Sequence, residues 1–153
     1  MFKVGFIGAG DIAYLHGEGV TQAQGAELTG IWNRTSVKAE EKARLFSCKV
    51  FQSPEELIEA VDVVYVLTNM ETHHLYAKQA LEAGKHVLVE KPTAVTIAEI
   101  VDLKRTAEKN SVQVAPVHNY IYEPSLLRAK EMIESGKLGD LVSLYVLYNI
   151  HHP

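Results

Sequence analysis

Two unbroken apolar runs, Val63–Leu67 and Val87–Val89, constrain the fold of this 153-residue chain more than any other feature. Runs of this kind are typical of parallel strands that helices cover on both faces. The segment between them predicts the connecting helix, and Glu90, Lys91 and Pro92 follow the second run directly. Because ligands bind at the carboxyl ends of the strands in an open α/β sheet, Lys91 is predicted to lie where chemistry would occur.

Strand and helix signals also alternate along the rest of the chain. Ser53 as an N-cap, followed by Pro54 and two acids, marks the start of one helix. Thr96 is the expected cap of another, whose apolar stripe would comprise Ile97, Ile100, Val101 and Ala107, with the stem of Lys104 at its edge. The other expected elements are strands at Phe2–Ile7, Leu28–Trp32 and Val112–Val117 and helices at 11–20 and Ser36–Phe46. This order predicts an α/β fold with a doubly wound parallel sheet.

The last part of the chain has a different pattern. Pro124–Ser135 predicts a helix with Gly136 as its C-cap, and Leu141–Ile150 predicts a long strand. We therefore expect a dinucleotide-binding Rossmann domain over residues 1–122. Residues 123–153 would form the interdomain helix and the first strand of an otherwise missing C-terminal α+β domain. In the alternative, Leu141–Ile150 is an extra edge strand of the same sheet.

Composition limits the classes of function. Hydrophobic residues make up 47% and charged residues 22%, as in ordinary globular domains. The net charge of -4 argues against a nucleic-acid-binding surface, and no apolar stretch is long enough to span a membrane. Cys48 is the only cysteine and the N-terminus does not resemble a signal peptide, so a cytoplasmic location is expected.

A glycine-rich turn follows the first strand. Gly8 would allow a tight turn, Gly10 would let a pyrophosphate approach the backbone, and Ala13 would permit close packing of helix on strand. The strand before the turn and the helix after it are the context in which this pattern indicates dinucleotide binding. Asp11 and Ile12 are predicted to lie beside the phosphates, although Asp11 is also placed to cap the helix. The alternative is a turn with only a structural role.

The end of the second strand bears on the choice of cofactor. NAD enzymes usually place an acidic residue there to bind the adenosine ribose, but this chain has Asn33 and Arg34. Asn33 would not repel a 2′-phosphate, and Arg34 could bind one together with Thr35 and Ser36. In the alternative, Arg34 stacks on the adenine and Asn33 bonds the ribose. NADP is therefore favoured over NAD.

Several motifs resemble the N-terminal half of the Gfo/Idh/MocA oxidoreductases. They are Gly8-Ala9-Gly10, Ala83-Gly84-Lys85-His86-Val87, Glu90-Lys91-Pro92 and Gly136-Lys137-Leu138-Gly139. The resemblance implies a nicotinamide-dependent enzyme that acts on a sugar, cyclitol or similar polyol, with a C-terminal domain that holds the substrate and commonly mediates homo-oligomerisation. It also implies that this chain alone would bind the dinucleotide without efficient turnover.

The resemblance further implies roles for individual residues. Lys91 would be the catalytic residue and would also contact the nicotinamide, Glu90 would support its loop, and the Lys91–Pro92 bond would often be cis. Thr68, Asn69 and His73 match the stretch that lines the cofactor, although Asn69 replaces a common proline. For His73, the alternative is a role in capping or packing.

The resemblance also places Asn119 at the nicotinamide end or the active-site floor. No metal site is expected, because His151 and His152 are adjacent on a predicted strand and would point to opposite faces. The predicted function is hydride transfer between nicotinamide and a polyol or sugar. A non-catalytic dinucleotide sensor and a redox-assisted glycosidase are the alternatives.

Overall fold

A computed structural model describes residues 1–147 and 149 of the chain. It contains two compact units, Met1–Val117 and His118–Pro153. The first holds the sheet and the glycine-rich turn, and each unit is described below by itself. Within the described ranges, no helix has the length and apolar character needed to cross a membrane.

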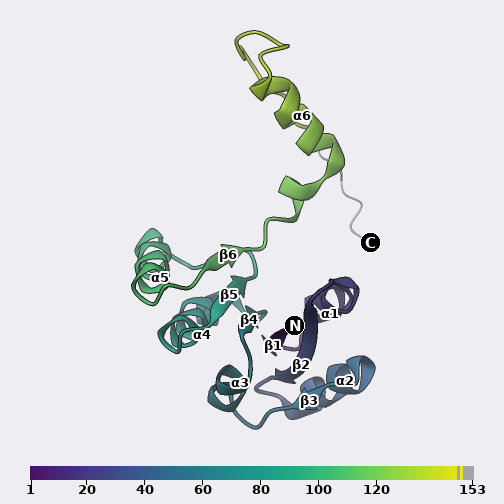
Figure 1. Cartoon of the computed structure of the whole chain (residues 1–153), viewed down its shortest axis with the longest axis vertical. Coiled ribbons are helices and arrows are strands. Elements are labelled where there is room, and N and C mark those ends of the chain that lie inside the picture. The colour runs from purple at the N-terminus through teal and green to yellow at the C-terminus, as the bar shows by residue number, and fades with distance from the viewer. Residues whose placement is uncertain (148, 150–153) are drawn as a thin grey trace. The chain divides into compact units, whose positions relative to one another are not determined.

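The first unit contains a six-stranded sheet in which every pair of neighbouring strands is parallel. The strands are β1 (Phe2–Ile7), β2 (Ala26–Trp32), β3 (Lys49–Val50), β4 (Val63–Val66), β5 (His86–Val89) and β6 (Val114–Pro116). Their order in the sheet is β3-β2-β1-β4-β5-β6 (Figure 1). The direction of winding therefore reverses between β1 and β4, the point at which such sheets bind ligands.

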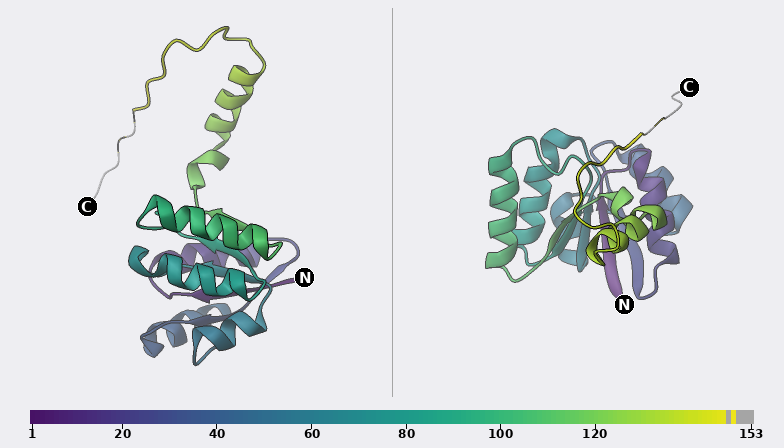
Figure 2. Two further views of the ribbon diagram at one scale, coloured as in Figure 1. Left: turned by 90° about the vertical axis from the view of Figure 1, so that its left-hand side faces the viewer. Right: turned by 90° about the horizontal axis from the view of Figure 1, so that it is seen from above.

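Five helices cover the two faces of this sheet: α1 (Ile12–Gln22), α2 (Ser36–Phe46), α3 (Pro54–Ala60), α4 (Met70–Glu82) and α5 (Ile97–Lys109). The first two lie on one face and the other three on the opposite face, as the right-hand view of Figure 2 shows for α1, α2, α4 and α5. One buried cluster joins the sheet to α1 and α2, and a second joins it to α3, α4 and α5. The expected doubly wound α/β fold is confirmed.

Local signals located most of these elements correctly. The Ser53 hydroxyl accepts a hydrogen bond from the Glu56 amide at 3.1 Å. Thr96 and Glu99 form a reciprocal capping box at the start of α5. The prediction did not name β3, which has too few residues for a recognisable pattern. It lies at the edge of the sheet and pairs only with β2.

The prediction of which side of α5 is buried was wrong. Ile97, Ile100 and Val101 are 80%, 45% and 40% exposed, whereas the buried residues of the helix are Leu103, Thr106 and Ala107. Only Ala107 belongs to both sets. Apolar residues occur around much of this helix, so spacing alone did not identify the side that packs against α4 and β6.

The second unit begins with a short 3₁₀ helix, η1 (Asn119–Tyr122), and continues into α6 (Pro124–Glu134). Gly136 follows with a left-handed φ of 71°. The strand expected over Leu141–Ile150 is not formed in residues 141–147, where no other described strand pairs with the backbone. Without a partner, a strand leaves its amides and carbonyls unpaired. Ile150, His151 and His152 lie outside the described residues.

We predict opposite effects on stability for two glycine-to-alanine substitutions. A Cβ at Gly30 would lie 2.5 Å from the Lys49 carbonyl oxygen, so Gly30→Ala should lower the free energy of unfolding by about 1–3 kcal/mol. A Cβ at Gly19, within α1, meets nothing within 4 Å, so Gly19→Ala should raise it by about 0.5–1 kcal/mol. Urea denaturation measures both values. Equal effects would contradict the packing described between β2 and β3.

Candidate functional site

The turn after β1 lies against the end of β4. Gly8 has a φ of 116°, and a Cβ at this position would lie 2.6 Å from the carbonyl carbon and oxygen of Leu67. The Leu67 amide also donates to the Ile7 carbonyl at 2.8 Å, which holds the two strand ends together. The protein's own packing therefore requires glycine at position 8.

Gly10 occupies a different environment. A Cβ there would meet no protein atom within 4 Å, and the residue lines a hollow of about 260 Å³. Gly10 immediately precedes Asp11 and α1, and the N-terminus of a helix favours an anion. Asp11 is the N-cap residue but makes no side-chain capping bond, so the capping alternative for its carboxylate is not realised. The open space at Gly10 fits a dinucleotide phosphate.

The hollow brings together three loops at the carboxyl ends of β1, β2 and β4. Its lining residues are Gly10, Trp32, Asn33, Arg34, Thr35, Lys38, Leu67, Thr68, Asn69, Thr72 and Tyr76. Five of them were predicted as cofactor ligands: Gly10, Asn33, Arg34, Thr68 and Asn69. The sequence analysis missed Lys38, Thr72 and Tyr76. The available signals were positional: Lys38 lies in the first turn of α2, directly after the predicted ligands Asn33 and Arg34, and Thr72 and Tyr76 lie one turn apart on α4.

Asn33 connects two of these loops. Its Oδ1 accepts a hydrogen bond from the Ala9 amide at 3.1 Å, and its Nδ2 donates to the Thr35 carbonyl at 3.0 Å. The carboxamide thus ties the glycine-rich turn to the end of β2. It also supplies an uncharged group where an acidic residue would repel a phosphate.

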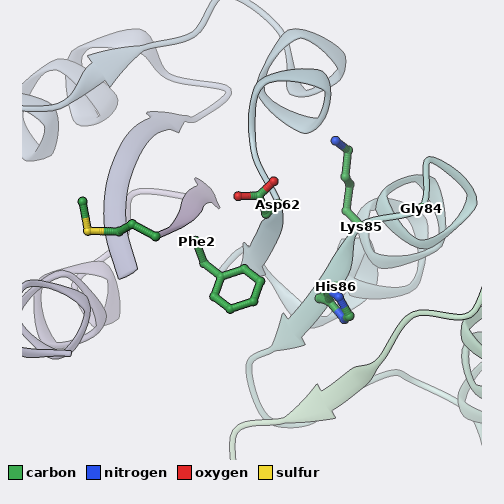
Figure 3. Close-up of a pocket in the computed structure, with 6 residues that line it drawn as sticks. Phe2, Asp62, Gly84, Lys85 and His86 are labelled. Carbon is green, nitrogen blue, oxygen red and sulfur yellow. The ribbon is translucent and has the colours of Figure 1, made fainter. Parts of the chain in front are cut away.

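Another hollow lies at the opposite end of the strands. Met1, Phe2, Asp62, Gly84, Lys85 and His86 line it, around the amino ends of β1, β4 and β5 (Figure 3). The Asp62 carboxylate already accepts a hydrogen bond from the Lys3 amide at 2.8 Å. Because parallel sheets bind ligands at the carboxyl ends of their strands, we do not assign the cofactor to this hollow.

The loop after β5 contains the predicted catalytic lysine. Lys91 is exposed, and the Lys91–Pro92 bond is cis, as the family resemblance implied. Glu90 is only 7% exposed, and its two carboxylate oxygens have different partners. Oε2 accepts from the Lys91 amide at 2.8 Å, and Oε1 lies 2.9 Å from Nε2 of His16 on α1. His16 was not singled out from the sequence.

His73 holds the same loop from α4. It is 2% exposed, with Nδ1 2.8 Å from the Pro92 carbonyl oxygen and Nε2 2.8 Å from the Thr68 carbonyl oxygen. Since both ring nitrogens face backbone oxygens of the protein, the geometry favours the packing alternative over direct contact with a cofactor. His73 therefore links the Lys91 loop to Thr68, which lines the hollow.

Two other predictions concern Asn119 and metals. Asn119 begins η1 in the second unit, and its contact with the nicotinamide stays a prediction. Among residues 1–147 and 149, no three or more His, Cys, Asp or Glu side chains form a group that could hold a metal ion.

Comparison with known proteins identifies the family. The family model described as "Oxidoreductase family, NAD-binding Rossmann fold" matches residues 2–118. The chain belongs to the Gfo/Idh/MocA family. It is 36% identical over 146 residues to glucose-6-phosphate 3-dehydrogenase of Bacillus subtilis (strain 168), a match that covers 95% of this chain and 42% of that protein.

Two further matches show the range of similar proteins. The scyllo-inositol 2-dehydrogenase (NADP(+)) IolW of Bacillus subtilis (strain 168) is 30% identical, with 99% of this chain and 42% of that protein covered. The structure of GenD2 from gentamicin A biosynthesis in complex with NAD superimposes with a TM-score of 0.84 at 28% identity, covering 89% of this chain and 40% of that one. The chain thus spans less than half the length of these similar proteins.

We predict that Gly10→Ala separates cofactor binding from folding. The added Cβ meets no protein atom, so the melting temperature should be unchanged, while NADPH binding should weaken by at least about tenfold, or about 1.4 kcal/mol. Calorimetric titration and thermal unfolding measure the two quantities. The matched variant Gly8→Ala should lower the melting temperature, because its Cβ would collide with Leu67. Unchanged NADPH binding by Gly10→Ala would contradict the assignment of the phosphate site.

Proposed function

We propose that the enzyme containing this chain is an NADP-dependent oxidoreductase. It would transfer a hydride between the nicotinamide and a hydroxyl or carbonyl carbon of a sugar, cyclitol or similar polyol. The observation that carries this proposal is the link through His73, whose ring joins the Pro92 carbonyl to the Thr68 carbonyl. That link ties the loop of Lys91 to Thr68, which lines the hollow next to the reversal of strand order.

Lys91 is suited to acid–base work in such a reaction. Oxidation of an alcohol removes a hydride from carbon and a proton from oxygen, and the bound nicotinamide supplies the hydride acceptor. A positioned amine can hydrogen-bond the reacting oxygen and take or return its proton. The Lys91 side chain is exposed and extends from a loop that the buried Glu90 anchors. The anchored backbone limits the positions that the amine can reach.

The charges around the hollow support NADP as the cofactor. Arg34 and Lys38 are cationic, Thr35 offers a hydroxyl group, and no acidic residue is among the described residues that line the hollow. Two cations can share the 2′-phosphate, which an acidic residue at the same place would repel. The NADP(+) in the name of the inositol dehydrogenase supports this choice, and the NAD complex of GenD2 makes NADH the necessary comparison.

We predict that the chain binds NADPH at least about tenfold more tightly than NADH, a difference of about 1.4 kcal/mol. Trp32 is the only tryptophan and lines the hollow, so quenching of its fluorescence measures both affinities. Arg34→Gln and Lys38→Met should each weaken NADPH binding and leave NADH binding nearly unchanged. Equal affinities in the unmodified chain would contradict the choice of NADP.

We predict that Lys91→Met lowers the rate of hydride transfer by about 10²-fold or more in the enzyme containing this chain. The affinity for NADPH should change by less than about threefold, because the loss of a proton-transfer group affects the chemical step. Nicotinamide absorbance with a panel of sugars and cyclitols gives the rates. Lys85→Met, at the opposite end of β5, is the matched control.

Two outcomes would count against the catalytic role. Full activity of Lys91→Met would exclude Lys91 as the acid–base group. Tight cofactor binding by the unmodified enzyme with no oxidation or reduction of any polyol would instead favour the sensor function.

A further inference from the structure

The proposed function makes no use of the contact between His16 and Glu90. The two residues are 74 positions apart, yet His16 Nε2 lies 2.9 Å from Glu90 Oε1. Their side chains are only 15% and 9% exposed. Burial of a carboxylate is costly unless it receives hydrogen bonds, so this contact has a large effect on where Glu90 can lie.

The orientation of the His16 ring is fixed by aromatic neighbours. Its centroid lies 6.4 Å from that of Phe6 on β1 and 5.6 Å from that of Tyr65 on β4, both in edge-to-face geometry. Phe6 and Tyr65 stack on each other at 5.3 Å. The ring is therefore packed on the two central strands, with Nε2 directed toward Glu90.

The Glu90 carboxylate connects His16 to the backbone of Lys91. The Glu90 amide donates to the Val66 carbonyl at 3.0 Å, which anchors the backbone of Glu90 to β4. Its Oε1 contacts His16, and its Oε2 accepts from the Lys91 amide. Without His16, one oxygen of a buried carboxylate would lose its partner, and the carboxylate would turn toward water. The Lys91 amide would then lose its acceptor.

We propose that His16 is a positioning residue for Lys91. By holding the Glu90 carboxylate, it sets the backbone from which the Lys91 amine reaches the reacting oxygen. The importance of this position for catalysis rests on the proposed function of Lys91. His73 on α4 holds the same loop at Pro92, so the two helices that begin at the cofactor hollow together hold residues 90–92.

Three variants of the chain separate the hydrogen bond from general packing. His16→Leu removes the Nε2 donor and puts an apolar side chain of similar size in place of the ring. His16→Gln places an amide nitrogen near the position of Nε2 and so retains a donor. His74→Leu is the matched control, because His74 Nε2 contacts the Asp102 carboxylate at 2.8 Å between α4 and α5 and its ring bonds none of residues 90–92.

Hydrogen exchange of single amides, measured by NMR on the whole chain, tests the proposal. In His16→Leu the Lys91 amide should exchange at least about tenfold faster, while the Glu90 and Val117 amides change by less than about twofold. Those two amides bond to the backbone at Val66 and Val89 and do not depend on the carboxylate. His16→Gln should restore protection of Lys91, and His74→Leu should leave it unchanged.

Three results would overturn the proposal. They are unchanged exchange at Lys91 in His16→Leu, a uniform increase at Lys91, Glu90 and Val117, and failure of His16→Gln to restore protection. The uniform increase would show that His16 contributes only packing. Because amide exchange involves no turnover, these results are independent of the rate measured for Lys91→Met. Failure of the proposed function and failure of this inference are therefore distinguishable.

Discussion

The close approach of β1 and β4 is the constraint on which the site depends. Gly8 lies so near the Leu67 carbonyl that no side chain fits between the two strand ends. Each of these strands then leads into a helix, α1 or α4, and the two helices cover opposite faces of the sheet. The hollow lies where the chain leaves β1 toward one face of the sheet and leaves β4 toward the other. The packing that joins these two strands therefore also creates the space for a dinucleotide.

The divergence of α1 and α4 also explains how the lysine loop is held. β5 is next to β4, so its carboxyl end is within reach of side chains from both helices. His16 from α1 contacts the buried Glu90 carboxylate, and His73 from α4 contacts the Pro92 carbonyl. These contacts act on the residues before and after Lys91 and leave its own side chain exposed. The loop thus combines a fixed backbone with an accessible amine, which is the arrangement that acid–base chemistry requires.

Features with local causes could be predicted from the sequence. The apolar strands predicted within residues 1–117, the Ser53 and Thr96 caps and the glycine-rich turn depend on neighbouring residues, and the structure confirms each of them. Contacts between distant segments could not be predicted. His16 has no signal in its own helix, because its partner lies across the sheet on the loop after β5. The prediction of the buried side of α5 was wrong for the same reason. The neighbours of a helix, as well as its own sequence pattern, decide which of its faces is buried.

The polar residues at the hollow have two different roles, one in holding the loops and one in meeting a ligand. Asn33 bonds to the Ala9 amide and the Thr35 carbonyl, so its carboxamide is committed to holding two loops. Arg34 and Lys38 lie beyond it with exposed side chains that can meet a phosphate. An aspartate at position 33 could accept from Ala9 but could not donate to Thr35, and its charge would oppose a 2′-phosphate. An asparagine at this position therefore satisfies both the folding of the loops and the electrostatics that the proposed binding of NADP requires.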